Sequence, residues 1–178
     1  MKPLRLLIAS AILVLFGGCL SRPPFEDPYI RPQIDWKPAL MLDAGQAERI
    51  LGKKGRLEKV TAYLDGETRT YQASFRDDQL DPVTGRAGVL GYKYEEYESA
   101  ETARAFLDST LKANRLDPKD GIRMEGGAEL HYFTGGDATR MFMILKENRL
   151  IGIKVNPLTS RYSLVELRMV ATELAKKL

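Results

Sequence analysis

Only one cysteine, one histidine and one tryptophan occur among the 178 residues of this chain. A single cysteine cannot form an internal disulfide, and one cysteine with one histidine cannot supply the four ligands of a usual structural zinc site. An excess of one charge is also missing, since 27 lysines and arginines are balanced by 24 acidic residues. With 44% hydrophobic and 29% charged residues, the composition predicts one ordinary globular domain. We expect no cofactor.

The longest uncharged apolar run, Leu6 to Phe16, directly follows the positive residues Lys2 and Arg5. A helix that crosses a bilayer takes about 20 apolar residues, so this run is too short for a span. A short apolar run after a positively charged start is typical of a secretory signal peptide. We therefore expect residues 1–18 to be a signal peptide.

The run ends in Phe16-Gly17-Gly18-Cys19, which resembles the lipobox of bacterial lipoproteins, although leucine is usual in that family where Phe16 stands. The alternative is a plain secretory signal with an incidental cysteine. The only cysteine directly follows two glycines, which favours the lipobox. The resemblance implies that Cys19 becomes the first mature residue and carries a diacylglycerol and an acyl chain such as palmitate, enough to anchor the protein stably in a membrane.

Two features of the mature chain bear on its location and partners. Leu20 does not resemble the aspartate that retains lipoproteins at the inner membrane, which favours the outer membrane if the organism has two membranes. Cleavage also removes Lys2 and Arg5, so the mature protein is nearly neutral. Binding to nucleic acid requires a concentrated basic surface, and we expect no nucleic-acid partner.

Five prolines among residues 19–38 exclude a helix or an inner strand there. We expect this segment to be a lipidated, proline-rich tether and residues 39–178 to be the globular domain. Trp36 lies near the end of the tether. Docking of the tether's last part onto the domain is favoured over an aromatic anchor at the membrane surface.

Periodicity and capping residues predict the elements of the domain. Helices are expected at 43–52 (capped by Asp43 and Gln46), 99–113 and 163–178, and strands at 56–64, 68–75, 87–97, 121–133 (one broken strand or a pair), 138–146 and 150–156. We therefore predict a single α+β domain with a roughly six-stranded antiparallel sheet and helices packed on it. The order strand, strand, strand, helix occurs twice, which suggests a (βββα)×2 pseudo-repeat.

The carboxyl-terminal half carries a second resemblance. The stretches Gly127–Phe133, Phe142–Leu145 and Ile153–Asn156, with the helix that starts at Ser163, resemble a family of small, uncharacterised extracytoplasmic lipoproteins. The resemblance covers residues 85–178. It implies an exported α+β domain and no particular activity.

His131 is the only imidazole, and in principle it can act with Ser160 or Ser163 and Asp137 as a hydrolytic triad. Against this, the chain has no G-x-S-x-G motif and Ser163 is expected to cap a helix. A histidine packed in a strand is the favoured interpretation, and we predict no catalytic residue.

A polar loop with Asp77, Asp78, Asp81 and Thr84 carries the oxygen atoms that calcium prefers. The spacing matches no EF-hand, so we favour a solvated loop and predict no metal site.

Aromatic residues are the best binding candidates in the sequence. Five tyrosines fall on neighbouring predicted strand segments and can form one aromatic face: Tyr63, Tyr71, Tyr92, Tyr94 and Tyr97. Packing between strands explains them adequately, and a ligand platform is the less favoured interpretation.

Together these observations predict a membrane-anchored extracytoplasmic lipoprotein that acts as a noncatalytic binding or envelope-assembly module. Its expected partners are the membrane, through Cys19, and an envelope protein. The alternatives are a structural lipoprotein that stabilises an envelope complex and, less favoured, a hydrolase using His131.

Replacing the lipid acceptor tests the anchor. Cys19→Ala should abolish incorporation of radioactive palmitate and leave an unprocessed precursor, because the thiol is the acceptor and the peptidase needs the modified residue. Label in the variant equal to that in the parent would refute the lipoprotein prediction.

Overall fold

The structure, a computed structural model, describes residues 31–117, 120–135 and 139–178. Cys19 and the signal peptide lie outside these residues. Within them the strands are β1 (Gly55–Asp65), β2 (Thr68–Asp77), β3 (Val89–Glu96), β4 (Ile122–Arg123), β5 (Glu129–Gly135), β6 (Thr139–Lys146) and β7 (Arg149–Val155). The helices are α1 (Ala44–Leu51), α2 (Ala100–Ala113) and α3 (Leu164–Lys177).

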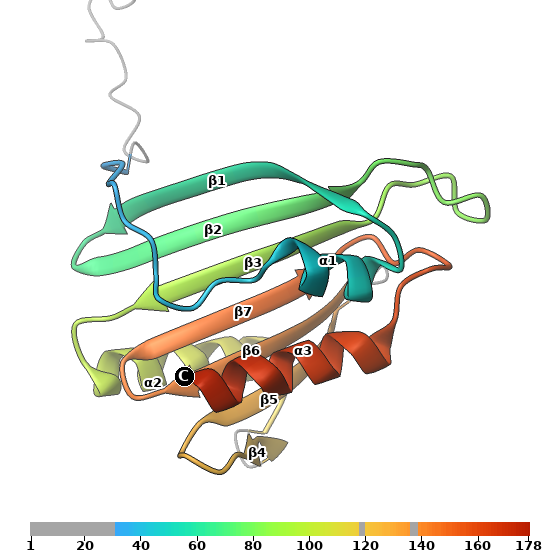
Figure 1. The fold of residues 1–178 in the computed structure, drawn as a ribbon. Helices are drawn as coiled ribbons and strands as arrows, with labels where there is room; N and C mark the ends of the chain where they lie inside the picture. The colour runs from blue at the N-terminus through green and yellow to red at the C-terminus, as the bar shows by residue number, and fades with distance from the viewer. Residues whose placement is uncertain (1–30, 118–119, 136–138) are drawn as a thin grey trace, which may run out of the picture. The chain divides into compact units, whose positions relative to one another are not determined.

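All of these strands pair in one antiparallel sheet, in the order β1-β2-β3-β7-β6-β5-β4 (Figure 1). The predicted α+β class is confirmed, but the sheet has seven strands in the described residues and not six. The extra strand is β4, because the stretch predicted as one broken strand or a pair is a pair. Gly126 and Gly127 turn between β4 and β5 with φ angles of 89° and 86°, which glycine adopts at no steric cost.

The helix boundaries follow from local capping. Asp43 and Gln46 form the predicted capping box at the start of α1, and Gly52 ends that helix in the left-handed conformation. The hydroxyls of Ser99 and Ser163 accept the N–H groups of the third helical residues of α2 and α3. Local sequence therefore determines all three helix starts.

The two faces of the sheet are covered unequally. Helices α1 and α3 pack on one face, and α2 packs on the other (Figure 1). Strand β6 is buried on both faces, with Ile144 directed to one side and Leu145 to the other, which agrees with its continuous apolar run Met141–Leu145. The larger core lies under α1 and α3.

On the second face, α2 packs mainly on the half of the sheet formed by β5, β6 and β7. Its residues Ala103, Leu107 and Leu111 pack on Phe133, Met143, Leu145 and Leu150. Phe106 of α2 is 41% exposed because it lies at the border of the covered half. The (βββα)×2 pseudo-repeat is not confirmed, since the helix after β3 and the helix after β7 cover opposite faces of the sheet.

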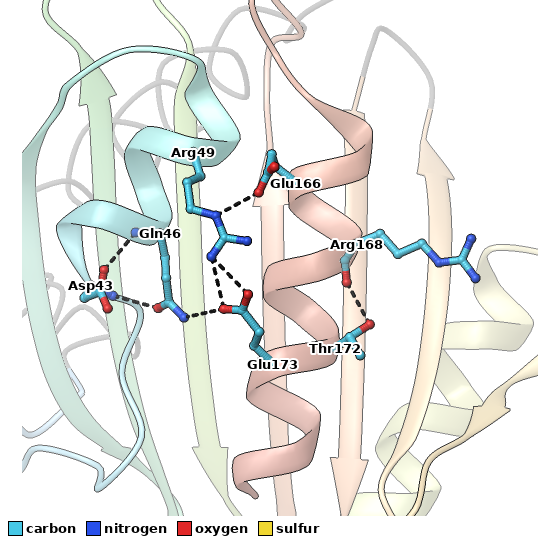
Figure 2. A network of polar contacts seen from close by, with 7 residues as sticks. All are labelled: Asp43, Gln46, Arg49, Glu166, Arg168, Thr172 and Glu173. Atoms are coloured by element: carbon cyan, nitrogen blue, oxygen red, sulfur yellow. Dashed lines mark hydrogen bonds and ion pairs between the residues drawn. The ribbon is translucent and has the colours of Figure 1, made fainter.

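Polar contacts connect α1 to α3 (Figure 2). Arg49 donates to Glu166 at 2.8 Å and to Glu173 at 3.0 Å, and Gln46 donates to Glu173 at 3.4 Å. At the start of α3, Ser163 caps the helix as expected, but Glu166 does not bond back to the Ser163 N–H. The Glu166 carboxylate binds Arg49, and the Ser163 N–H donates to the carbonyl of Ile50. The hydrogen bonds from Arg49 lower the pKa of Glu173.

Residues 31–38, the described end of the predicted tether, lie on the domain. Ile34 and Leu64 form backbone hydrogen bonds of 3.0 Å that connect this segment to β1. Trp36 then packs edge to face on Tyr94, with 5.8 Å between the ring centroids. Docking of Trp36 agrees with the favoured interpretation.

The buried side of α3 should be essential to folding. Leu167 and Leu174 are fully buried, so Leu167→Ala and Leu174→Ala should each lower the free energy of unfolding by about 2–5 kcal/mol. On the same helix Val165 is 68% exposed, and Val165→Ala should change it by less than about 0.5 kcal/mol. Chemical denaturation measures all three. Equal stability of the leucine variants and the parent would show that these leucines of α3 do not pack in the core.

Candidate functional site

A groove of about 420 Å³ occupies the half-covered face of the sheet, beside α2. Its walls are α2 on one side, with Phe106 and Thr110, and β1 on the other, with Lys59 and Thr61. Strands β2, β3, β7 and β6 form the floor. The volume lies within the usual range of small-molecule sites, about 300–1,000 Å³.

Strand register places the lining residues in two rows that cross the sheet. The first row is Lys59, Ser74, Gly91, Lys154 and Met141. The second row is Thr61, Gln72, Lys93, Gly152 and Met143. Because side chains alternate between faces along a strand, all ten positions face the groove.

Two of these positions, Gly91 and Gly152, are glycines in the middle of central strands. Neither adopts a positive φ, and a Cβ atom on either would meet its nearest neighbour only at 3.8 or 4.0 Å. Glycine inside a strand costs about 0.5–1 kcal/mol relative to alanine, so the fold itself does not favour glycine here. Glycine in a strand interior often marks a place where a ligand approaches the backbone closely.

The groove has a polar side and an apolar side. Hydroxyl and amide groups of Thr61, Gln72 and Ser74 lie over β1 and β2. Towards β6 and α2 the lining becomes apolar, with Met141 and Phe106. The arrangement is suited to binding and orienting a molecule with one polar and one apolar end.

The five tyrosines do not share a face. Tyr71, Tyr92 and Tyr94 are buried in the core under α1 and α3, and Tyr63 and Tyr97 lie on the other face. All five are at most 7% exposed. Burial raises the pKa values of Tyr92 and Tyr97 well above the usual range. Their shared structural feature is packing within the domain, and none of them except Tyr92 touches the groove.

His131 is buried and bound away from the candidate serines. Its Nε2 lies 2.6 Å from a carboxylate oxygen of Glu129, and Arg104 of α2 binds the same carboxylate. These contacts, that of Arg104 foremost, lower the pKa of Glu129. Ser160 and Ser163 form other hydrogen bonds, to Asp81 and at the start of α3. The structure therefore does not bring His131 together with either serine, and Asp137 lies outside the described residues.

In the aspartate loop, Asp81 is fully buried, and both oxygens of its carboxylate accept hydrogen bonds. One oxygen accepts the N–H groups of Val83 and Thr84, at 3.0 and 2.8 Å. The other accepts the N–H of Ser160 at 2.9 Å and the Ser160 hydroxyl. These hydrogen bonds, and that from the Ser160 hydroxyl most of all, hold the pKa of Asp81 far below its usual range. The carboxylate joins the loop after β2 to the loop after β7.

No group of three or more histidine, cysteine, aspartate or glutamate side chains in the described part of the chain is arranged to hold a metal ion. Among the helices that the structure describes, none has the length and apolar character needed to span a membrane.

By fold and site, the protein is an α+β domain with a groove on the half-covered face of an antiparallel sheet. No protein family, curated protein or solved structure detectably matches the chain. Its function must therefore be inferred from the groove and the amino terminus.

Replacing Asp81 tests the loop connection. Asp81→Asn should lower the urea midpoint at pH 7, because an N–H₂ group then replaces one carboxylate oxygen. That group would face other donors, either the N–H and hydroxyl of Ser160 or the N–H groups of Val83 and Thr84. Since the folded-state pKa of Asp81 is depressed, the carboxylate's stabilising effect is complete above about pH 4 and is lost as the pH falls further.

The difference between parent and variant should therefore be largest near neutral pH and should narrow towards pH 3. Asp78→Asn, at the exposed neighbouring aspartate, is the matched control and should have little effect. A difference between parent and Asp81→Asn that stays constant from pH 7 to pH 3 would contradict this account.

Proposed function

We propose that this protein is a membrane-anchored extracytoplasmic lipoprotein whose domain is a noncatalytic binding module, with the groove as its binding site. The sequence Phe16-Gly17-Gly18-Cys19 after an apolar run supports the anchor. Leu20 favours the outer membrane in a bacterium with two membranes. Through Cys19 the membrane itself is one partner of the protein.

The observation that carries the binding role is the pair of strand glycines in the groove floor. Gly91 and Gly152 reduce strand stability, and neither a positive φ nor a close contact requires them. A side chain at either position would project into the groove. The fold has room for a side chain at both positions, but the glycines leave that part of the groove empty. An empty space of this kind is expected where a ligand binds.

A noncatalytic role fits the lining better than a reaction does. Lysine, glutamine, threonine and methionine side chains line the groove together with Glu95, and Glu95 is held by Lys93 at 2.6 Å. No nucleophile paired with a general base occurs among the lining residues. The groove is thus equipped to hold a molecule.

Filling the groove should block binding. The test uses residues 19–178 with Cys19→Ser, which leaves out the lipid, and the neutral apolar dye N-phenyl-1-naphthylamine, which fluoresces strongly in apolar surroundings. The parent should bind the dye, and Gly152→Leu should weaken its apparent affinity about tenfold or more. Gly152→Leu should remain folded, because an added Cβ there meets no atom closer than 4.0 Å.

Thr134→Leu is the matched control, since it adds the same side chain at an exposed strand position outside the groove. It should bind the dye like the parent. Thermal unfolding of each variant verifies that the fold is retained. Dye binding that is absent from the parent, or that Gly152→Leu leaves unchanged, would refute the groove as the binding site.

A further inference from the structure

The charges around the groove indicate the kind of molecule that it binds. Three lysines and one glutamate line the groove. Lys93 is paired with Glu95 at 2.6 Å and lies 5.9 Å from the centre of the Phe106 ring. Lys59 and Lys154 have no acidic partner in the part of the chain that the structure describes. The groove therefore holds two positive charges that an anionic group can neutralise.

These two lysines belong to one row of the sheet. Lys59 on β1 and Lys154 on β7 are separated by Ser74 and Gly91. Three strand spacings put their Cα atoms about 14 Å apart, and lysine carries its charge on a long, flexible stem. Both ammonium groups can therefore approach one anionic group above Gly91, where the Ser74 hydroxyl offers a further donor.

Beyond Gly91 the lining changes from polar to apolar. Gly152 opens the floor, and Met141, Met143 and Phe106 surround it. An anionic group near Ser74 would thus continue into a space suited to an apolar body.

The state of the backbone favours a hydrocarbon over a peptide in that space. The strands of the floor are paired on both sides across the groove, from β2 through β3 and β7 to β6. Their N–H and C=O groups are used in the sheet, so a peptide lying on this floor would find few partners for its own backbone. An unpaired polar group on an apolar surface costs free energy, whereas an aliphatic chain incurs no such cost.

The size of the groove and the donor groups in its lining limit which kind of ligand and head group it can bind. A groove of about 420 Å³ is suited to a single-chain molecule. Lysine binds carboxylates and phosphates alike as a point charge, whereas phosphate sites commonly add the free N–H groups of a helix start. No helix start in the described residues lines this groove, because Phe106 and Thr110 lie in the middle and the last part of α2. A carboxylate needs only the point charges that lysines supply.

Resting on the proposed function, we propose that the ligand of the groove is a long-chain carboxylate, an aliphatic chain that ends in one carboxylate group. The carboxylate lies between Lys59 and Lys154, and the chain extends over Gly152 towards Met143 and Phe106. The two strand glycines provide the room for this chain.

Displacement of N-phenyl-1-naphthylamine from residues 19–178 with Cys19→Ser tests the proposal, because this neutral dye can be used with every variant. Palmitate should displace the dye at lower concentration than hexadecanol, which has the same chain without a charge. Lys59→Gln combined with Lys154→Gln should weaken palmitate binding about five- to tenfold. The same double variant should leave hexadecanol binding unchanged.

The matched control is Lys54→Gln combined with Lys112→Gln, two exposed lysines outside the groove, which should leave palmitate binding unchanged. Equal binding of palmitate and hexadecanol, with no effect of the groove lysines, would overturn the carboxylate while the groove remained a binding site. If hexadecyl phosphate or an acidic peptide binds more tightly than palmitate, the ligand belongs to that class and not to the long-chain carboxylates. If Gly152→Leu does not weaken dye binding, the proposed function itself fails.

Discussion

The antiparallel pairing of β3 with β7 is the interaction on which the rest of the structure depends. It joins the strands β1–β3 and β4–β7 into one sheet, and its register places Leu90 opposite Val155 and Tyr92 opposite Ile153 in the core. The same register places Gly91 and Gly152 on the other face. A slip of one residue would exchange the two faces of a strand, so one set of hydrogen bonds defines both the core and the groove floor.

Unequal covering of the sheet creates the groove. Two helices, joined through Arg49, close one face, whereas α2 alone covers half of the other. Apolar packing and the ion pair between Arg104 and Glu129 hold α2 over β5–β7. The uncovered half must be compatible with water, which explains the polar side chains of β1 and β2. It also leaves Phe106 and the neighbouring methionines beside open space, where an apolar molecule can shield them.

Much of the fold could be predicted from the sequence, but little of the candidate site could. Alternating and periodic apolar residues, with caps such as Asp43 and Ser99, located nearly all strands and helices because these signals act within a few residues. The tyrosines were the best binding candidates in sequence, yet alternation along three strands sends them to different faces. One signal for the groove was present: a glycine in the middle of a strand pattern, as at Gly91 and Gly152. Only pairing shows that these glycines are diagonal neighbours on one face.

The sequence by itself determined the local structure of this protein: where the helices start, where the chain turns between β1 and β2, and the signal that predicts an anchor at Cys19. Tertiary structure alone decided which face α2 covers, that Glu166 binds Arg49, and that Lys59 and Lys154 belong to one row across the sheet. The physical reason is the range of the interactions. Caps and turns are satisfied by neighbours in the chain, whereas a groove consists of residues from β1, β2, β3, β6, β7 and α2 that only long-range strand pairing and helix packing bring together.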